Sequence, residues 1–366
     1  MGLTSLGLLA LLALMTTSLP WLLLLLWRRA PRSSRWPAVL LVVGVMLAQA
    51  TAIAAVCVGV NRAFGFFPTW GALFGRPPPI PALVSVPARP ADPRVLAEPA
   101  GDHGSFRTFR VTGERSGIRD SVLAWLPPQY SDSSFASTRF PVVTVLGSAY
   151  LPVRSFVGQL DFGRVASAEI RAGRLAPFVA VFPEINVQLP VDTECTDIPG
   201  GSQGYTWLAD DVPTWAEDTL RVLPRGAAWS VMGYSTGGFC AAKLQLREPG
   251  TFAAAAVLEG YFRPELDGTT GDLARLYAAD PALARANSPE QLVVGRAGRA
   301  AAAARVLVMT STSDPQSYAA SVRFVDLARG LPGVRLYLVP GAGHSFAVVR
   351  SVIPTALAWL AAQSGG

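Results

Sequence analysis

Residues 233–237 read GYSTG and follow the spacing Gly-x-Ser-x-Gly. An apolar run typical of a buried strand precedes them, and a run of small residues typical of a helix, ending at Gly250, follows them. A serine at a strand–turn–helix junction lies on a strained turn, and the amide N–H groups of the helix N-terminus face developing negative charge. The pattern predicts that Ser235 is a nucleophile. The simpler alternative is a serine that caps the helix.

A nucleophilic serine needs a general base, and the chain contains only two histidines, His103 and His344. His103 precedes the first expected strand, whereas His344 follows the last expected strand in a glycine-rich loop. In hydrolases with this turn, the acid lies between the serine and the histidine in the chain. Asp314, just after the penultimate expected strand, fits best, and Glu259 is the alternative acid. We therefore predict a triad of Ser235, Asp314 and His344, in which the acid fixes the imidazole tautomer.

The negative charge of an acyl-transfer intermediate needs two backbone N–H donors. One is expected from Thr236, the residue after the nucleophile, and the other from Ser148 or Gly147 in the loop after an early central strand. The sequence has no cluster with metal-ligand spacing and no phosphate-binding loop, so we expect no metal and no cofactor.

Two of the three cysteines are expected to lie near this site in space. Cys195 belongs to an acid-rich loop, residues 191–201, and Cys240 lies five residues beyond the expected nucleophile. Outside the cytoplasm, such a pair can be oxidised, which predicts a Cys195–Cys240 disulfide. The alternatives are that Cys240 is simply a small buried helix residue, and that the loop is solvated rather than shaping the site.

Continuous apolar segments alternate with helical segments from about residue 105 onward. A hairpin, residues 106–118 and 119–130, opens this region, and six further apolar strands follow. This alternation predicts a mostly parallel sheet covered by helices on both faces, an α/β three-layer sandwich that brings the strand ends carrying the site to one edge.

The N-terminal part differs from the rest in composition and charge. Residues 1–27 and 37–60 are expected to form two transmembrane helices, and 28–36 an arginine-rich loop that the positive-inside rule places in the cytoplasm. Residues 61–104 read as a proline-rich linker, and 105–366 as the catalytic domain facing outward. A cleaved signal peptide is the rival for the first segment, and two buried core helices are a further alternative.

The net charge of +6 does not indicate a nucleic-acid partner. The first 104 residues carry eight arginines and three acids, a net charge of +5, so the rest of the chain carries only +1. The basic character therefore belongs mostly to the membrane end of the chain.

The order of the motifs resembles an esterase family that includes esterase-D-like enzymes and the mycolyltransferases of actinobacterial envelopes. The motifs that carry the resemblance are "VLGSAYL", "YTWLADDVPTW", "MGYSTGGFCAAKLQLREP", "LEGYF" and "GAGHSF", within residues 105–363. The resemblance implies an α/β-hydrolase fold and acyl-ester chemistry, with Ser235 as nucleophile and His344 as base. Mycolyltransferases use a glutamate as the acid, and their trehalose-binding segments have no clear counterpart here.

The sequence as a whole predicts a membrane-anchored serine esterase or acyltransferase on the outer side of the membrane. Its substrate would be an acyl ester, such as a lipid or an envelope glycolipid. The alternative is a non-catalytic envelope-binding protein that retains a hydrolase scaffold.

Overall fold

The computed structural model describes residues 5–29, 36–64, 70, 83–84, 102–149, 151–187, 191–266, 268–294, 296, 302–339, 344 and 346–364. The chain divides into two compact units, Met1–Pro78 and Pro79–Gly366, which are described separately. Most of the expected proline-rich linker lies outside the described residues, as does most of the expected arginine-rich loop.

The first unit contains two long apolar helices, α1 (Leu6–Arg29) and α2 (Trp36–Phe64). The helices are antiparallel, because Thr16 Oγ1 lies 3.2 Å from Thr51 Oγ1 while Leu23 packs against Gly44. Gly44 permits this close approach, since a Cβ there would overlap the Leu23 side chain. Both helices are long and apolar enough to cross a membrane.

The second unit is built on a nine-stranded sheet with the order β1-β2-β3-β5-β4-β6-β7-β8-β9 among the described residues. Strand β3 pairs antiparallel with β2 and with β5, and the other pairs are parallel. The strands are β1 (Leu83–Val84), β2 (Ser105–Thr112), β3 (Arg119–Leu126), β4 (Val142–Leu146), β5 (Val179–Pro183), β6 (Gly226–Tyr234), β7 (Phe252–Leu258), β8 (Val306–Thr310) and β9 (Val334–Leu338).

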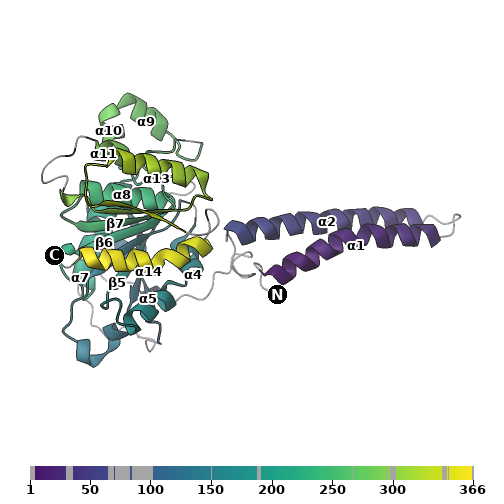
Figure 1. Ribbon diagram of the computed structural model, residues 1–366, viewed down its shortest axis with the longest axis horizontal. Coiled ribbons are helices and arrows are strands. Elements are labelled where there is room, and N and C mark those ends of the chain that lie inside the picture. Colours follow the sequence, from purple (N-terminus) through teal and green to yellow (C-terminus); the bar gives the residue numbers. More distant parts are fainter. Residues whose placement is uncertain are drawn as a thin grey trace. The chain divides into compact units, whose positions relative to one another are not determined.

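Helices cover both faces of this sheet (Figure 1). One apolar core lies between the sheet and the layer of α7, α8 and α13, and a second lies between the sheet and the layer of α4, α5 and α14. The helices are α4 (Val153–Leu160), α5 (Phe162–Arg171), α6 (Gly204–Thr206), the π-helical turn η3 (Trp207–Asp211), α7 (Val212–Thr219), α8 (Thr236–Arg247), α9 (Leu273–Ala279), α10 (Pro281–Ala286), α11 (Pro289–Val293), α13 (Pro315–Leu327) and α14 (Phe346–Gln363). Two short 3-10 turns, η1 (Pro128–Ser131) and η2 (Ser133–Phe135), follow β3. The three-layer α/β sandwich predicted from the sequence is confirmed.

The expected opening hairpin is present as β2 and β3, with Phe109 opposite Val122 in the antiparallel register. The central strands β4, β5, β6, β7 and β8 are buried along most or all of their length, which explains why they read as continuous apolar runs. Between β7 and β8 the chain inserts α9, α10 and α11, and α11 packs against α8 and α13 (Figure 1). The parallel strands therefore end at one edge, where the predicted site residues follow β4, β6, β7 and β8.

Candidate active site

Ser235 occupies the sharp turn between β6 and α8. Its backbone has φ 57° and ψ −122°, a left-handed conformation that is strained for a residue with a side chain. The amide of Ser235 donates to the carbonyl of Leu258 at the end of β7 (3.0 Å), which fixes the turn against the neighbouring strand. The turn also brings α8 close to β6, and a Cβ on Gly233 would overlap the carbonyl of Gly237. These constraints explain why the motif needs glycines on both sides of the serine.

The structure brings Asp314 and His344 together. His344 Nδ1 lies 2.7 Å from Asp314 Oδ2, and because a carboxylate only accepts, the imidazole donates and keeps its proton on Nδ1. The other carboxylate oxygen of Asp314 accepts from the amide of Ser317 (3.2 Å), at the start of α13. The His344 ring lies 4.8 Å, centroid to centroid, from the ring of Tyr234, the residue before Ser235. His344 is therefore next to the serine turn, and Nε2 is the ring nitrogen that Asp314 does not use.

Glu259, the alternative acid, follows β7 and also has a left-handed backbone, with φ 47°. Its side chain is 2% exposed, and Oε2 accepts from the hydroxyl of Thr310 (3.3 Å). Burial raises the pKa of Glu259 to about 7, and the charge of Asp314 adds to this effect. The geometry thus distinguishes the two candidate acids. Asp314 binds the histidine, whereas Glu259 is buried and binds Thr310.

One carboxylate oxygen from each of Glu259 and Asp314 and one ring nitrogen of His344 lie within 4.8 Å of one another. These are the only described histidine, cysteine and acidic side chains grouped closely enough to hold an ion. Because Asp314 and His344 already bind each other in this group, we interpret it as an acid–base pair with a second carboxyl.

The two segments expected to form the oxyanion site lie side by side. Leu146 at the end of β4 pairs with Gly233 of β6, so Gly147 and Ser148 leave the sheet next to the serine turn. A Cβ on Gly237 would overlap the carbonyls of Leu146 and Gly147, which shows how closely the first turn of α8 approaches this loop. Thr236 is the first residue of α8, where backbone N–H groups have no partner within the helix.

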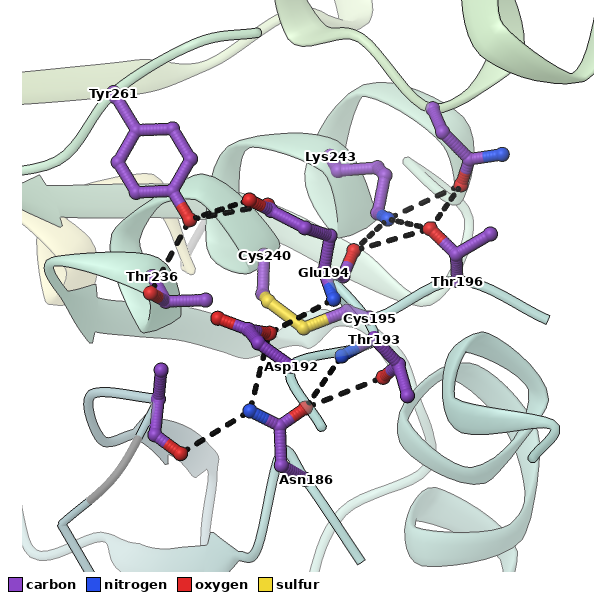
Figure 2. Close-up of a disulfide and its surroundings, with 12 residues drawn as sticks. Asn186, Asp192, Thr193, Glu194, Cys195, Thr196, Thr236, Cys240, Lys243 and Tyr261 are labelled. Atoms are coloured by element: carbon purple, nitrogen blue, oxygen red, sulfur yellow. Dashed lines mark hydrogen bonds between the residues drawn. A yellow bond between two sulfur atoms is a disulfide. The ribbon is translucent and has the colours of Figure 1, made fainter. Parts of the chain in front are cut away.

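Cys195 and Cys240 are joined by a disulfide, with their Cα atoms 5.9 Å apart (Figure 2). The bond attaches the segment of residues 191–203, here called the stapled loop, to α8. The alternative of a solvated loop is wrong for residues 192–196, whose side chains are all at most 4% exposed.

Lys243, on the same helix as Cys240, also binds this loop. Its ammonium donates to the carbonyl of Glu194 (2.5 Å) and to Asn287 Oδ1 (3.1 Å), and it is fully buried. Burial raises the pKa of the Glu194 carboxyl and lowers that of the Lys243 ammonium, while their opposite charges act against both shifts.

Reasoning from the sequence missed the residues of this buried network, which include Asn186, Glu194, Lys243 and Tyr261. One signal was present: Lys243 is the only lysine in the chain and lies in the expected helix directly after the nucleophile. His103, which was set aside as a base, contributes its backbone carbonyl to the indole N–H of Trp125 (2.9 Å).

The fold and the turn define a serine hydrolase of the α/β-hydrolase class. Residues 117–362 match the model of the esterase family, which carries the description "Putative esterase". Because the match covers more than half of the chain, the protein belongs to this family of carboxylic ester hydrolases. An uncharacterized protein of Corynebacterium glutamicum is 22% identical over 335 residues, which cover 88% of this chain and 76% of the relative.

Solved structures with the same fold come from esterases and related hydrolases. A ferulic acid esterase superposes with a TM-score of 0.62 at 16% identity, covering 72% of this chain and 99% of its own. A fluorophosphonate-binding serine hydrolase of Staphylococcus aureus gives 0.58 at 16% identity, with 70% and 98% covered. An S-formylglutathione hydrolase of Agrobacterium tumefaciens gives 0.57 at 18% identity, with 72% and 97% covered. At these identities the likeness establishes the shared fold.

Proposed function

We propose that this protein is a membrane-anchored serine esterase or acyltransferase that acts on acyl esters through Ser235, His344 and Asp314. The observation that carries the proposal is the strained Ser235 turn beside an Asp314–His344 pair whose proton is held on Nδ1. This arrangement leaves Nε2 able to accept the serine proton.

The proposed chemistry has two half-reactions. Ser235 Oγ attacks the ester carbonyl carbon while His344 Nε2 takes the hydroxyl proton, and the oxyanion is held by the amides of Thr236 and of Ser148 or Gly147. The carbon–oxygen bond to the alcohol then breaks, and His344 returns the proton to the leaving alkoxide. Water or another hydroxyl group next attacks the acyl-enzyme, and Ser235 is released with its proton restored.

The proposed location is the outer side of a membrane. Two helices of sufficient length and hydropathy precede the catalytic domain, and the arginines between them favour a cytoplasmic position for their connection. An even number of spans then places the catalytic domain outside, near lipid or envelope esters.

Phosphonate labelling, together with an ester-hydrolysis assay, tests the activity and the location. The detergent-solubilised full chain should react with a fluorophosphonate and hydrolyse p-nitrophenyl esters, and Ser235→Ala should abolish both without changing the circular dichroism spectrum. A charged, membrane-impermeant phosphonate should label intact cells as strongly as lysed cells. Equal behaviour of the wild type and Ser235→Ala would instead indicate a non-catalytic envelope-binding protein, and labelling only after lysis would place the domain inside.

A further inference from the structure

The stapled loop is linked to both segments that are expected to bind the oxyanion, through Asn186 on one side and Tyr261 on the other. On one side, Asn186 Nδ2 donates to the carbonyl of Ala149 (3.1 Å), next to Ser148, and to Asp192 Oδ1 (3.1 Å). On the other side, the hydroxyl of Tyr261 lies 3.0 Å from Glu194 Oε2 and 3.2 Å from Thr236 Oγ1. Figure 2 shows this chain of contacts from Asn186, past the disulfide, to Thr236.

The position of Glu194 is imposed by its surroundings. Glu194 and Cys195 have consecutive left-handed backbones, with φ 50° and 49°. Such conformations are unfavourable for residues other than glycine, and they persist only where surrounding contacts compensate for the strain. Here the contacts are the disulfide to Cys240, the Lys243 ammonium on the Glu194 carbonyl, and the amide of Glu265 on the Glu194 carboxylate (3.1 Å).

Tyr261 is held in the same way from two sides. Its ring stacks on Phe239 of α8 with centroids 5.0 Å apart, and it is buried. Its hydroxyl lies within hydrogen-bond distance of both the Glu194 carboxyl group and Thr236 Oγ1, so it links these two side chains. The Thr236 side chain is thereby fixed at the first turn of α8.

We propose that Tyr261 is a positioning residue for Thr236 in the oxyanion site, and that Glu194, fixed by the Cys195–Cys240 disulfide, holds Tyr261 in place. The proposal rests on the function proposed for Ser235. Tyr261 touches no reacting atom in this scheme; it acts by keeping the Thr236 amide aligned, and small displacements of catalytic groups lower kcat strongly.

The test compares two tyrosines whose hydroxyls both bind this buried network. Tyr261→Phe removes the hydroxyl beside Thr236 but keeps the ring on Phe239. We expect kcat for p-nitrophenyl ester hydrolysis to fall about tenfold with KM within about twofold, which is less than the roughly 10²- to 10³-fold loss when an oxyanion donor is removed outright.

The matched control is Tyr277→Phe. The Tyr277 hydroxyl lies 2.8 Å from Thr196 Oγ1, in the stapled loop on the side of Lys243. This variant loses a buried hydroxyl of the same kind, so we expect a similar drop in Tm but an unchanged kcat. The double variant Cys195→Ala, Cys240→Ala should reproduce the effect of Tyr261→Phe on kcat.

Amide hydrogen exchange gives a readout that does not depend on activity. Exchange in a peptide covering residues 233–239 should be faster in Tyr261→Phe than in Tyr277→Phe. Equal kcat and equal exchange in the two variants would overturn the proposal. If the wild type neither labels nor hydrolyses, the proposed function fails, and the exchange comparison still decides the positioning role.

Discussion

Two carboxyl groups that are hard to distinguish in the sequence have different environments in the structure. Asp314 accepts a hydrogen bond from His344, whereas Glu259 is buried with a pKa raised to about 7. The sequence order predicted Asp314 as the acid, because the residue follows a late strand. The sequence also offered Glu259 as the alternative acid, but its burial was not predictable, because it depends on the parallel pairing of β7 with β8, which brings their two following loops together.

At the scale of these residues, Glu259→Gln should retain most of the ester-hydrolysing activity, with kcat within about tenfold of the wild type. Below its raised pKa the native Glu259 is already neutral, and the amide has the same size and no charge. Asp314→Asn is the matched control and should lower kcat by roughly three to four orders of magnitude, because the imidazole loses the acceptor that fixes its tautomer. A larger loss in Glu259→Gln than in Asp314→Asn would reverse the assignment of the acid.

The effect of Glu259→Gln on thermal stability should depend on pH. A carboxyl whose pKa rises from 4.5 in the unfolded chain to about 7 in the folded protein stabilises the fold fully below 4.5. That contribution is lost as the pH rises through about 7, and Glu259→Gln lacks this loss. The Tm of the variant relative to the wild type should therefore increase between about pH 5 and pH 8 in thermal unfolding.

At the scale of elements, the junction of β6 and α8 is set by backbone contacts that leave no room for a side chain. A Cβ on Gly237 would overlap the carbonyls at the end of β4, which are rigid parts of the sheet. Gly237→Ala should destabilise the fold by about 1–3 kcal/mol and reduce phosphonate labelling, because α8 must move away from the loop carrying Ser148. Chemical denaturation and labelling rates measure the two effects.

Gly158 provides the control for this prediction. It is an exposed position in α4, and a Cβ there would meet nothing within 4 Å. Gly158→Ala should leave labelling unchanged and stabilise the fold by roughly 0.5–1 kcal/mol, because alanine loses less backbone entropy in a helix. Loss of labelling in both variants would mean that the close approach at Gly237 has no special role.

The elements themselves were largely predictable, whereas for the stapled loop the sequence predicted the Cys195–Cys240 disulfide but not the buried network around it. Apolar runs defined β4, β6 and β8 because these strands are buried on both faces. The loop of residues 191–203 is acid-rich, which is as typical of a solvated loop as of one that shapes the site, yet residues 192–196 are buried by contacts with α8 and with the insertion before β8. Those contacts join segments far apart in the chain, such as Glu194 with Tyr261 and Lys243 with Asn287, and no local pattern encodes them.

At the scale of the whole molecule, charge and hydropathy divide along the chain. The apolar helices and most of the excess positive charge belong to the first 104 residues, while the catalytic domain is nearly neutral overall. This division fits a catalytic domain that does not depend on long-range attraction to a charged partner. Its proposed access to ester substrates would come from attachment to the membrane in which those esters are found.

The complete burial of Lys243 has a practical consequence for the intact protein. It is the only lysine in the sequence and is completely buried, so the folded chain offers amine-reactive reagents no accessible lysine side chain. Acylation of the lysine side chain, read by mass spectrometry, should therefore appear only when α8 separates from the loop above it. Lys243 is thus a chemical reporter of local unfolding in the helix that directly follows Ser235.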